Sequence, residues 1–150
     1  MTKEDILAKL PYGEAFLFVD DLIDIDEHGA TGTFTFRESL PFYSAHFQDF
    51  AVTPGVILTE TMAQIGLVCL GIFLAQADLS EKEFGVVMTS CAVDFLKPVF
   101  PGEKVTVISE KNYFRFNKLS CKVSMKNEKG DLVCKGTIAG MLTSNANGYN

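Results

Sequence analysis

"GVILTETMAQIGLVCLGIFLAQA", residues 55–77, carries a single charge in twenty-three residues, that of Glu60. A run this apolar approaches the length of a membrane span. No Lys or Arg directly flanks either end of the run. Its first half, however, holds four polar residues, Thr59, Glu60, Thr61 and Gln64. Membrane helices rarely carry such groups and are oriented by flanking cations. We therefore expect no membrane insertion, but a helix that is apolar on nearly all faces because a sheet wraps around it.

The start of this helix has recognisable signals. Thr53 is a good N-cap, Pro54 suits the first helical position, and Gly55 leaves its backbone N–H open to approach. Unpaired N–H groups in a first turn create positive potential, which would stabilise an oxygen that gains negative charge. Glu60 and Gln64 lie four residues apart, so we expect them on one face and in one cavity. Gln64 would hydrogen-bond either the Glu60 carboxyl or a neighbouring backbone group.

Alternating patterns on both sides of the helix predict strands. Upstream, residues 16–26 and 29–37 predict a hairpin whose turn contains His28, a residue we expect to be exposed. Downstream, four segments predict an antiparallel meander (85–98, 103–116, 118–130 and 131–142). The order of two strands, one long helix and four strands indicates an α+β fold in which an antiparallel sheet curls around the helix.

The chain length fits a single domain, which we place at residues 1–142. The remaining residues, 143–150, form a polar tail that we expect to be disordered. The amino terminus carries early acidic residues and lacks the apolar stretch of a signal peptide, which favours the cytoplasm. Four widely spaced cysteines without zinc-site spacing agree with a reducing compartment, and we expect all of them to be buried (Cys69, Cys91, Cys121 and Cys134).

The charge distribution limits the possible partners. A net charge of −6 and an isoelectric point near 4.8 argue against nucleic acid as a partner. Residues 97–126 are the exception, with seven basic and two acidic residues. This stretch predicts either a local basic surface for an acidic partner or a solvated strand face without one. Thirteen phenylalanines fit a Phe-rich core or, alternatively, an apolar cavity.

One arrangement of residues resembles a known family. His46-Phe47 precedes the turn Val52-Thr53-Pro54-Gly55-Val56, Glu60 follows His46 by fourteen positions, and Gln64 follows Glu60 by four. This arrangement resembles the 3-hydroxyacyl-acyl carrier protein dehydratases of fatty acid synthesis, the FabZ type, with FabA a more distant relation. The segments "FLFVDDL" (16–22) and "VDFLKPVFPGEKV" (93–105) are also similar to that family. Glutamate rather than aspartate at position 60 points to the FabZ type.

The resemblance implies a hot-dog fold and an assembly. In this family two subunits pair their sheets edge to edge, and trimers of such dimers occur. Each site takes its histidine from one chain and its acid from the other, and accepts an acyl chain on the phosphopantetheine arm of acyl carrier protein. No metal or other cofactor is implied. Because the docking helix of the carrier is acidic, we expect it to bind the basic stretch (Lys97, Arg115, Lys118 and Lys122).

The chemistry also follows from the residue types. Converting a (3R)-3-hydroxyacyl thioester to a trans-2-enoyl thioester requires a base for the carbon-bound proton, an acid for the departing hydroxyl and a donor for the carbonyl oxygen. We assign these roles to His46, to Glu60 with a pKa raised by apolar surroundings, and to the Gly55 N–H. Gln64, Val56 and Phe47 are expected to support them. A lone loop histidine or a lone buried glutamate is more often structural, but the joint spacing favours catalysis.

Three departures from the family pattern surround His46. Ala45, Gln48 and Phe50 stand where the family usually has glycine, proline and a second histidine. They change the loop that holds His46 and leave the His46–Glu60 pair intact. Two alternatives stay open: an acyl thioesterase on the same fold, in which the acidic residue activates water, and a non-catalytic module that binds acyl chains or carrier proteins.

Overall fold

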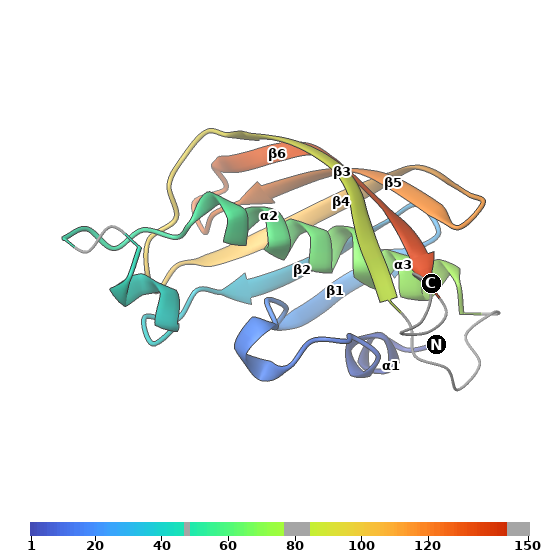
Figure 1. Ribbon diagram of the computed structural model, residues 1–150, viewed down its shortest axis with the longest axis horizontal. Helices are drawn as coiled ribbons and strands as arrows, with labels where there is room; N and C mark the ends of the chain where they lie inside the picture. The colour runs from blue at the N-terminus through green and yellow to red at the C-terminus, as the bar shows by residue number, and fades with distance from the viewer. Residues whose placement is uncertain (47–48, 77–84, 144–150) are drawn as a thin grey trace.

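The computed structural model describes residues 1–46, 49–76 and 85–143 (Figure 1). Six strands and one long central helix make up most of this part of the chain, with two short 3₁₀ helices, η1 and η2, before the central helix. The elements follow in the order α1 (Lys3–Ala8), η1 (Glu14–Phe16), β1 (Asp21–Asp26), β2 (Gly29–Thr35), η2 (Pro41–Ser44), α2 (Gly55–Ala63), η3 (Gln64–Val68), α3 (Cys69–Leu74), β3 (Gly85–Phe95), β4 (Lys104–Arg115), β5 (Lys118–Lys126) and β6 (Leu132–Thr143).

The strands form one antiparallel sheet in the order β1-β2-β4-β5-β6-β3. The predicted β1–β2 hairpin is confirmed, and His28 in its turn is exposed beside Glu27. The β4-β5-β6 meander is confirmed as well. The prediction that β3 begins this meander is wrong, because β3 pairs with β6 at the far edge and β2 takes the place beside β4. Sequence alternation shows which residues share a face of a strand, but not which strand lies next to it.

The segments α2, η3 and α3 form one continuous helix, Gly55–Leu74, on the concave side of the sheet (Figure 1). Within its most apolar window, 72% of the helix is buried inside the protein. The apolar run is therefore the core of the fold and not a membrane span. The arrangement is the hot-dog fold that the family resemblance implies.

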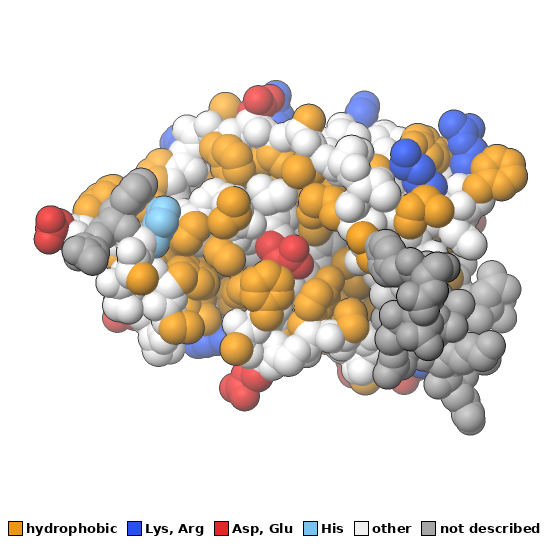
Figure 2. All heavy atoms as spheres, in the orientation of Figure 1, with side chains coloured by type: hydrophobic (Ala, Val, Ile, Leu, Met, Phe, Trp, Pro, Cys, Tyr) orange, Lys and Arg blue, Asp and Glu red, His pale blue; other side chains and the backbone are white. Residues whose placement is uncertain are grey.

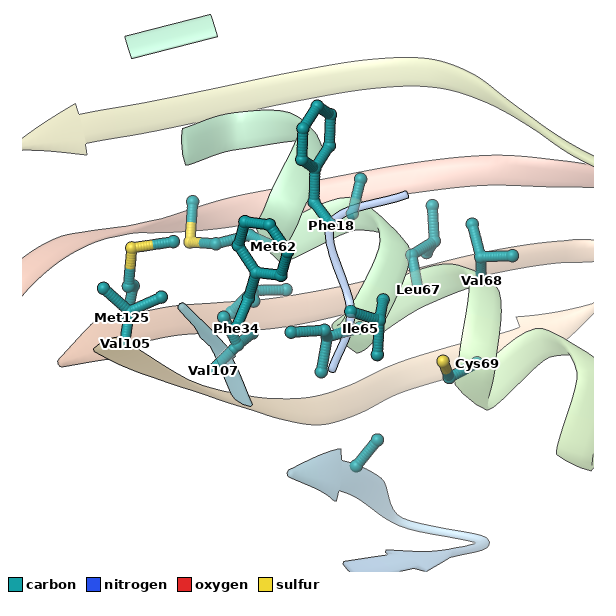
Figure 3. Packing of buried hydrophobic residues seen from close by; sticks show 14 of the residues in the cluster. Phe18, Phe34, Met62, Ile65, Leu67, Val68, Cys69, Val105, Val107 and Met125 are labelled. Carbon is teal, nitrogen blue, oxygen red and sulfur yellow. The ribbon is translucent and has the colours of Figure 1, made fainter. Parts of the chain in front are cut away.

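Side chains of the helix and the sheet meet in a hydrophobic core. Met62 and Ile65 project from the helix toward Val107 and Met125 on the sheet (Figure 3). The close approach depends on Gly66. A Cβ atom at Gly66 would lie 2.9 Å from the Ser109 Cβ and 3.0 Å from the Val123 Cγ1, so any larger residue would push the helix off β4 and β5.

The helix entry differs from the prediction. The N-cap is Pro54, which has no side-chain cap, and the Thr53 hydroxyl lies 2.6 Å from the Tyr43 hydroxyl instead. Both residues are buried, and a buried phenol requires a hydrogen-bond partner. The predicted Thr53 cap is therefore wrong, because the Thr53 hydroxyl forms a hydrogen bond with Tyr43 instead. This bond connects η2 to the start of the helix.

Three of the four cysteines are buried as predicted, and burial raises the pKa of Cys69, Cys121 and Cys134 to about 12. The prediction is wrong for Cys91, which is exposed on β3 because β3 is an edge strand. Strand β6 includes Thr143, the first residue of the expected tail, and residues 144–150 lie outside the described part of the chain.

Candidate active site

The first turn of the central helix opens onto a pocket. The N–H groups of Ile57 and Leu58 both donate to the Pro54 carbonyl, at 2.9 and 3.2 Å. These are the first bonds of the helix, so the Gly55 and Val56 N–H groups precede its internal hydrogen bonding. A pocket of about 290 Å³ lies here (lined by Thr53, Gly55, Leu58, Phe95, Leu96, Lys97 and Pro98). Most of the side chains that line the pocket are apolar, and Thr53 and Lys97 are the polar ones.

Glycine is needed at position 55 for access. A Cβ atom there would lie 3.3 Å from the Phe95 ring, which is tighter than most such contacts. Glycine therefore keeps the backbone N–H approachable from the pocket. The Val56 side chain is 76% exposed, so its expected supporting role does not involve packing within the protomer.

His46 is tied to the residues that lead into the helix. Its Nδ1 lies 2.8 Å from the Val52 carbonyl oxygen. A carbonyl only accepts, so Nδ1 carries the proton and the neutral ring has its lone pair on Nε2. The backbone N–H of His46 donates to Phe42 at 2.9 Å, and that of Thr53 donates to Val99 at 2.9 Å. The Val52 carbonyl thus favours the tautomer with the proton on Nδ1 and helps to orient the ring. Phe47 and Gln48 lie outside the described residues.

Glu60 is held by Gln64. The Gln64 side chain is fully buried, and its Oε1 accepts from the Phe18 N–H at 2.8 Å. Its Nε2 donates to the Phe16 carbonyl at 2.9 Å and to the Glu60 Oε2 at 3.0 Å. The two partners that the sequence left as alternatives for Gln64, a carboxyl and a backbone group, are therefore both present. Gln64 fixes the Glu60 carboxyl relative to the segment that precedes β1.

Burial raises the pKa of the Glu60 carboxyl above its ordinary value of 4.5, and the hydrogen bond from Gln64 opposes this rise. The charged form of Glu60 loses water of solvation, and the hydrogen bond from Gln64 offsets only part of this loss. A carboxyl in this environment is suited to hold a proton and to release it to a leaving group.

Gln64 also begins a π-helical turn, η3. The Cys69 N–H donates to the Gln64 carbonyl, five residues back, where an α-helix would use four. This extra residue shifts the faces of the helix after the Glu60–Gln64 pair. Such single π turns are frequent at functional sites. Nothing in the residue pattern of 64–68 indicated it.

The segment before β1 supplies site residues that the sequence analysis did not identify. Phe16 and Phe18 act through backbone atoms, which leave no signal in side-chain type. Tyr12 lies beside them, with its ring 6.3 Å from that of Phe16. Burial raises the pKa of the Tyr12 phenol, and the negative charge of Glu60 raises it further, which places the phenol within electrostatic reach of that carboxyl.

The predicted base and acid occupy different positions along the helix. His46 is bound to Val52, three residues before the helix begins, whereas Glu60 lies five residues after Gly55. At a rise of about 1.5 Å per residue, Glu60 is about 7–8 Å further along the axis than Gly55. We call the residues around His46 and Gly55 the base half and those around Glu60 and Gln64 the acid half of a candidate site, after the roles that the sequence predicts for them.

The four basic residues expected to dock a carrier do not form one surface of the protomer. Lys97 lies at the helix entry, with its amine 3.1 Å from Asp131. Arg115 and Lys118 face each other across the β4–β5 turn at the other end of the sheet. Lys122 lines a groove of about 440 Å³ on the face of the sheet that points away from the helix. Within the described ranges, no group of three or more His, Cys, Asp or Glu side chains is suited to a metal ion.

Comparison with known proteins gives consistent matches. The model of the FabA-like domain matches residues 10–140. The chain is 35% identical over 143 residues to a 3-hydroxyacyl-[acyl-carrier-protein] dehydratase FabZ of Herpetosiphon aurantiacus, covering 91% of this chain and 94% of that protein. It is 32% identical over 145 residues to the protein of the same name from Sinorhizobium medicae, covering 94% of this chain and 89% of the relative.

Solved structures support the fold at low sequence identity. The dehydratase heterocomplex ApeI:P of Xenorhabdus doucetiae superposes with a TM-score of 0.77 at 13% identity, covering 92% of this chain and 90% of that chain. A hypothetical thioesterase of Streptococcus pneumoniae, solved with coenzyme A, gives a TM-score of 0.69 at 17% identity, covering 96% and 98%. Because one neighbour is named a dehydratase and the other a thioesterase, the fold alone does not select between these two activities.

Proposed function

The chain belongs to the FabA-like family, and on that premise we propose that it is a hydro-lyase that dehydrates 3-hydroxyacyl thioesters carried on acyl carrier protein. The observation that carries the proposal is the Glu60–Gln64 arrangement, in which a half-buried carboxyl with a raised pKa is oriented by a fully satisfied amide. A carboxyl that only balanced a buried cation would instead have a lowered pKa.

In the proposed mechanism, His46 is the base and Gly55 the electrophilic donor. The Nε2 lone pair removes the proton next to the thioester carbonyl, while Nδ1 keeps its hydrogen bond to Val52. The negative charge that develops on the carbonyl oxygen is stabilised by the Gly55 N–H at the helix terminus. The pocket beside Gly55 is of a size that would hold the thioester and part of the arm.

Glu60 completes the elimination. As the carbon–oxygen bond breaks, the protonated carboxyl transfers its proton to the departing hydroxyl, which leaves as water. The electrons of the broken C–H bond form the double bond of the trans-2-enoyl product. Glu60 then holds a negative charge and His46 a positive one, and one proton passes from His46 to Glu60, directly or through water, to restore both. The mechanism uses the (3R) substrate and needs no metal or other cofactor.

We also propose that the complete site is shared between two subunits. Strand β3 leaves one edge unpaired among the described strands, and its residues Met88 and Phe95 are exposed. Hydrophobic side chains gather on the face of the molecule in front of the central helix (Figure 2). Pairing two β3 edges would cover this surface and bring the base half of one protomer toward the acid half of the other.

Subunit complementation tests this proposal. His46→Ala and Glu60→Ala homodimers are expected to be inactive and folded, whereas co-expressed mixed dimers are expected to recover activity at one of their two sites. The readout is the absorbance of the conjugated enoyl thioester formed from a 3-hydroxyacyl thioester. Mixed dimers that remain inactive while each variant folds would refute the shared site.

A second assay separates the proposal from thioester hydrolysis on the same fold. The dehydratase is expected to form enoyl thioester without releasing free thiol. Release of thiol from a saturated acyl thioester, with no enoyl product, would identify a thioesterase, and neither product would indicate a binding module. The buried thiols of Cys69, Cys121 and Cys134, which form no disulfide, support a cytoplasmic location. The similarity to FabZ dehydratases supports a role in fatty acid or related polyene or polyketide synthesis.

A further inference from the structure

The Tyr12 phenol lies near the acid half and has no role in the proposed mechanism. Its ring is half-buried against the hydrophobic core, and the centres of the Tyr12 and Phe16 rings are 6.3 Å apart. Among the described residues, only Thr33 has a fully buried side-chain oxygen without a hydrogen-bond partner. The Tyr12 hydroxyl also has no partner within this part of the chain, so its oxygen is not sealed in the core and is open to an incoming group.

The segment that carries Tyr12 is attached to the candidate acid through one buried amide. The Gln64 Nε2 donates to the Phe16 carbonyl at 2.9 Å, and the same nitrogen donates to the Glu60 Oε2 at 3.0 Å. The Gln64 Oε1 accepts from the Phe18 N–H of the same segment. Packing explains the position of the Tyr12 ring, and Gln64 holds its segment in a fixed relation to the Glu60 carboxyl.

The central helix shows on which side of this carboxyl the phenol lies. The Gln64 N–H donates to the Glu60 carbonyl, and the Cys69 N–H donates to the Gln64 carbonyl across the π turn. Glu60, Gln64 and Cys69 therefore follow one another along one face of the helix. Burial raises the pKa of the Tyr12 phenol, and the charges of Glu60 and Cys69 raise it further. Because such effects weaken with distance, the phenol lies over this face of the helix.

The chemistry of a phenol beside a protonated carboxyl is specific. With its pKa raised, the Tyr12 phenol keeps its proton at neutral pH, so it acts as a neutral donor and leaves proton transfer to Glu60. A 3-hydroxyl oxygen has two lone pairs, and the proton from Glu60 uses one of them. A second donor would bind the other lone pair and stabilise the negative charge that develops as the carbon–oxygen bond breaks.

We propose that Tyr12 is a catalytic residue of the acid half, whose hydroxyl donates a hydrogen bond to the 3-hydroxyl oxygen of the substrate. The inference rests on the proposed function, since it names a contact for the group that leaves. As the carbon–oxygen bond breaks, its electron pair stays on the oxygen, Glu60 supplies the proton, and water departs. Tyr12 keeps its own proton throughout. An acyl thioester without a 3-hydroxyl cannot make this contact.

The test compares Tyr12→Phe with Tyr113→Phe, and each change removes one hydroxyl and keeps the ring. Tyr113 is also half-buried, but it lies on β4 beside Arg115, near the β4–β5 turn. For Tyr12→Phe we expect kcat/KM for a 3-hydroxyacyl cysteamine thioester to fall about tenfold, the loss expected for one hydrogen bond. Tyr113→Phe should leave this value unchanged, and the melting temperature of neither variant should fall.

A saturated acyl thioester of the same chain length gives the second readout, because it lacks the 3-hydroxyl. As a competitive inhibitor, it should bind Tyr12→Phe and the unaltered protein equally well. A parallel loss of affinity for this inhibitor would mean that Tyr12 shapes the acyl-chain pocket and does not contact the 3-hydroxyl. That result would overturn the proposal.

The remaining outcomes are distinguishable. An unchanged kcat/KM in Tyr12→Phe would refute the catalytic role, and a lower melting temperature together with lost activity would make the hydroxyl structural. A pH–rate profile whose falling limb moves to higher pH in Tyr12→Phe would mean that the phenol donates to the Glu60 carboxylate; Tyr12 would then be a positioning residue, and the substrate contact would be wrong. If the unaltered protein forms no enoyl thioester, the proposed function fails instead.

Discussion

The two half-sites are built in different ways. In the base half, His46 contacts residues close in sequence, Phe42 and Val52, through backbone atoms. In the acid half, Gln64 joins Glu60 to Phe16 and Phe18, which lie 48 and 46 positions away. The base half is thus a local loop structure attached to the helix entry, whereas the acid half is part of the hydrophobic core.

This difference predicts that substitutions in the two half-sites affect catalysis and the free energy of unfolding differently. If the acid half acts in catalysis, substitutions that break its buried hydrogen bonds should lower both the activity and the free energy of unfolding. A half-site made of local backbone contacts should affect the reaction and leave the free energy of unfolding nearly unchanged.

Glu60→Gln should remove catalysis without disturbing the core. The carbonyl of the introduced amide retains the acceptor for Gln64, but the side chain no longer holds a transferable proton. We expect kcat to fall roughly 10²–10⁴-fold, the usual contribution of a general acid. The assay is enoyl thioester formation, with circular dichroism to confirm the fold. Activity within a few-fold of the unaltered protein would show that Glu60 is not the acid.

The raised pKa of Glu60 determines a pH dependence of the rate. Because the acid must be protonated, kcat/KM should fall about tenfold per pH unit above the pKa of Glu60. Burial raises that pKa, so the fall should begin at a higher pH than for an ordinary carboxyl. A pH–rate profile on a cysteamine thioester measures it. A profile that declines from the ordinary carboxyl range upward would contradict the assignment.

The same carboxyl affects stability with a defined sign. A folded-state pKa above the unfolded value of about 4.5 means that the unfolded chain loses this proton first as pH rises. The contribution of Glu60 to stability is therefore present below that value and is lost as pH rises through the folded pKa. The Glu60→Gln variant lacks this titration. Its free energy of unfolding, measured by urea titration, should therefore rise relative to that of the unaltered protein as pH increases through this window.

Gln64→Leu should destabilise the protein, unlike substitutions in the base half. It leaves the Phe16 carbonyl and the Phe18 N–H without their buried partner. We expect a loss of about 2–3 kcal/mol in the free energy of unfolding, since each unsatisfied buried group costs on the order of 1–3 kcal/mol. Gln76→Leu is the matched control, because the Gln76 hydrogen bond to Phe73 is exposed. Equal losses in the free energy of unfolding for the two variants would contradict the proposed stabilising role of the buried Gln64 side chain.

Most of the fold can be predicted from the sequence, because the spacing of apolar residues shows which face of each helix or strand is buried. The helix from Gly55 and the β1–β2 hairpin are examples. The edge position of β3 does not follow, since alternation carries no information about neighbouring strands, and the exposure of Cys91 was mispredicted for the same reason. For the site, spacing identified His46, Glu60 and Gln64 as candidates. The anchoring of Gln64 uses backbone atoms of a distant segment, which no residue type reveals.

The smallest effect is expected at Thr53, a buried residue that lies beside the base half and is not part of it. Thr53→Val is nearly isosteric and removes the 2.6 Å hydrogen bond to Tyr43. We expect a loss of about 1 kcal/mol in the free energy of unfolding, less than for Gln64→Leu. Tyr43→Phe removes the same bond from the other side. The double variant should lose less than the sum of the two, because neither hydroxyl is then left unsatisfied.

The Thr53 and Tyr43 variants also test whether the buried hydrogen bond between these two residues positions His46. The Thr53–Tyr43 bond joins η2 to the helix entry, and the loop between them carries His46. If His46 is positioned by its own bonds to Val52 and Phe42, kcat should change less than about threefold, which corresponds to about 0.6 kcal/mol. A large fall in kcat with little loss of stability would mean that the buried hydroxyl pair, and not the local backbone contacts, orients the imidazole.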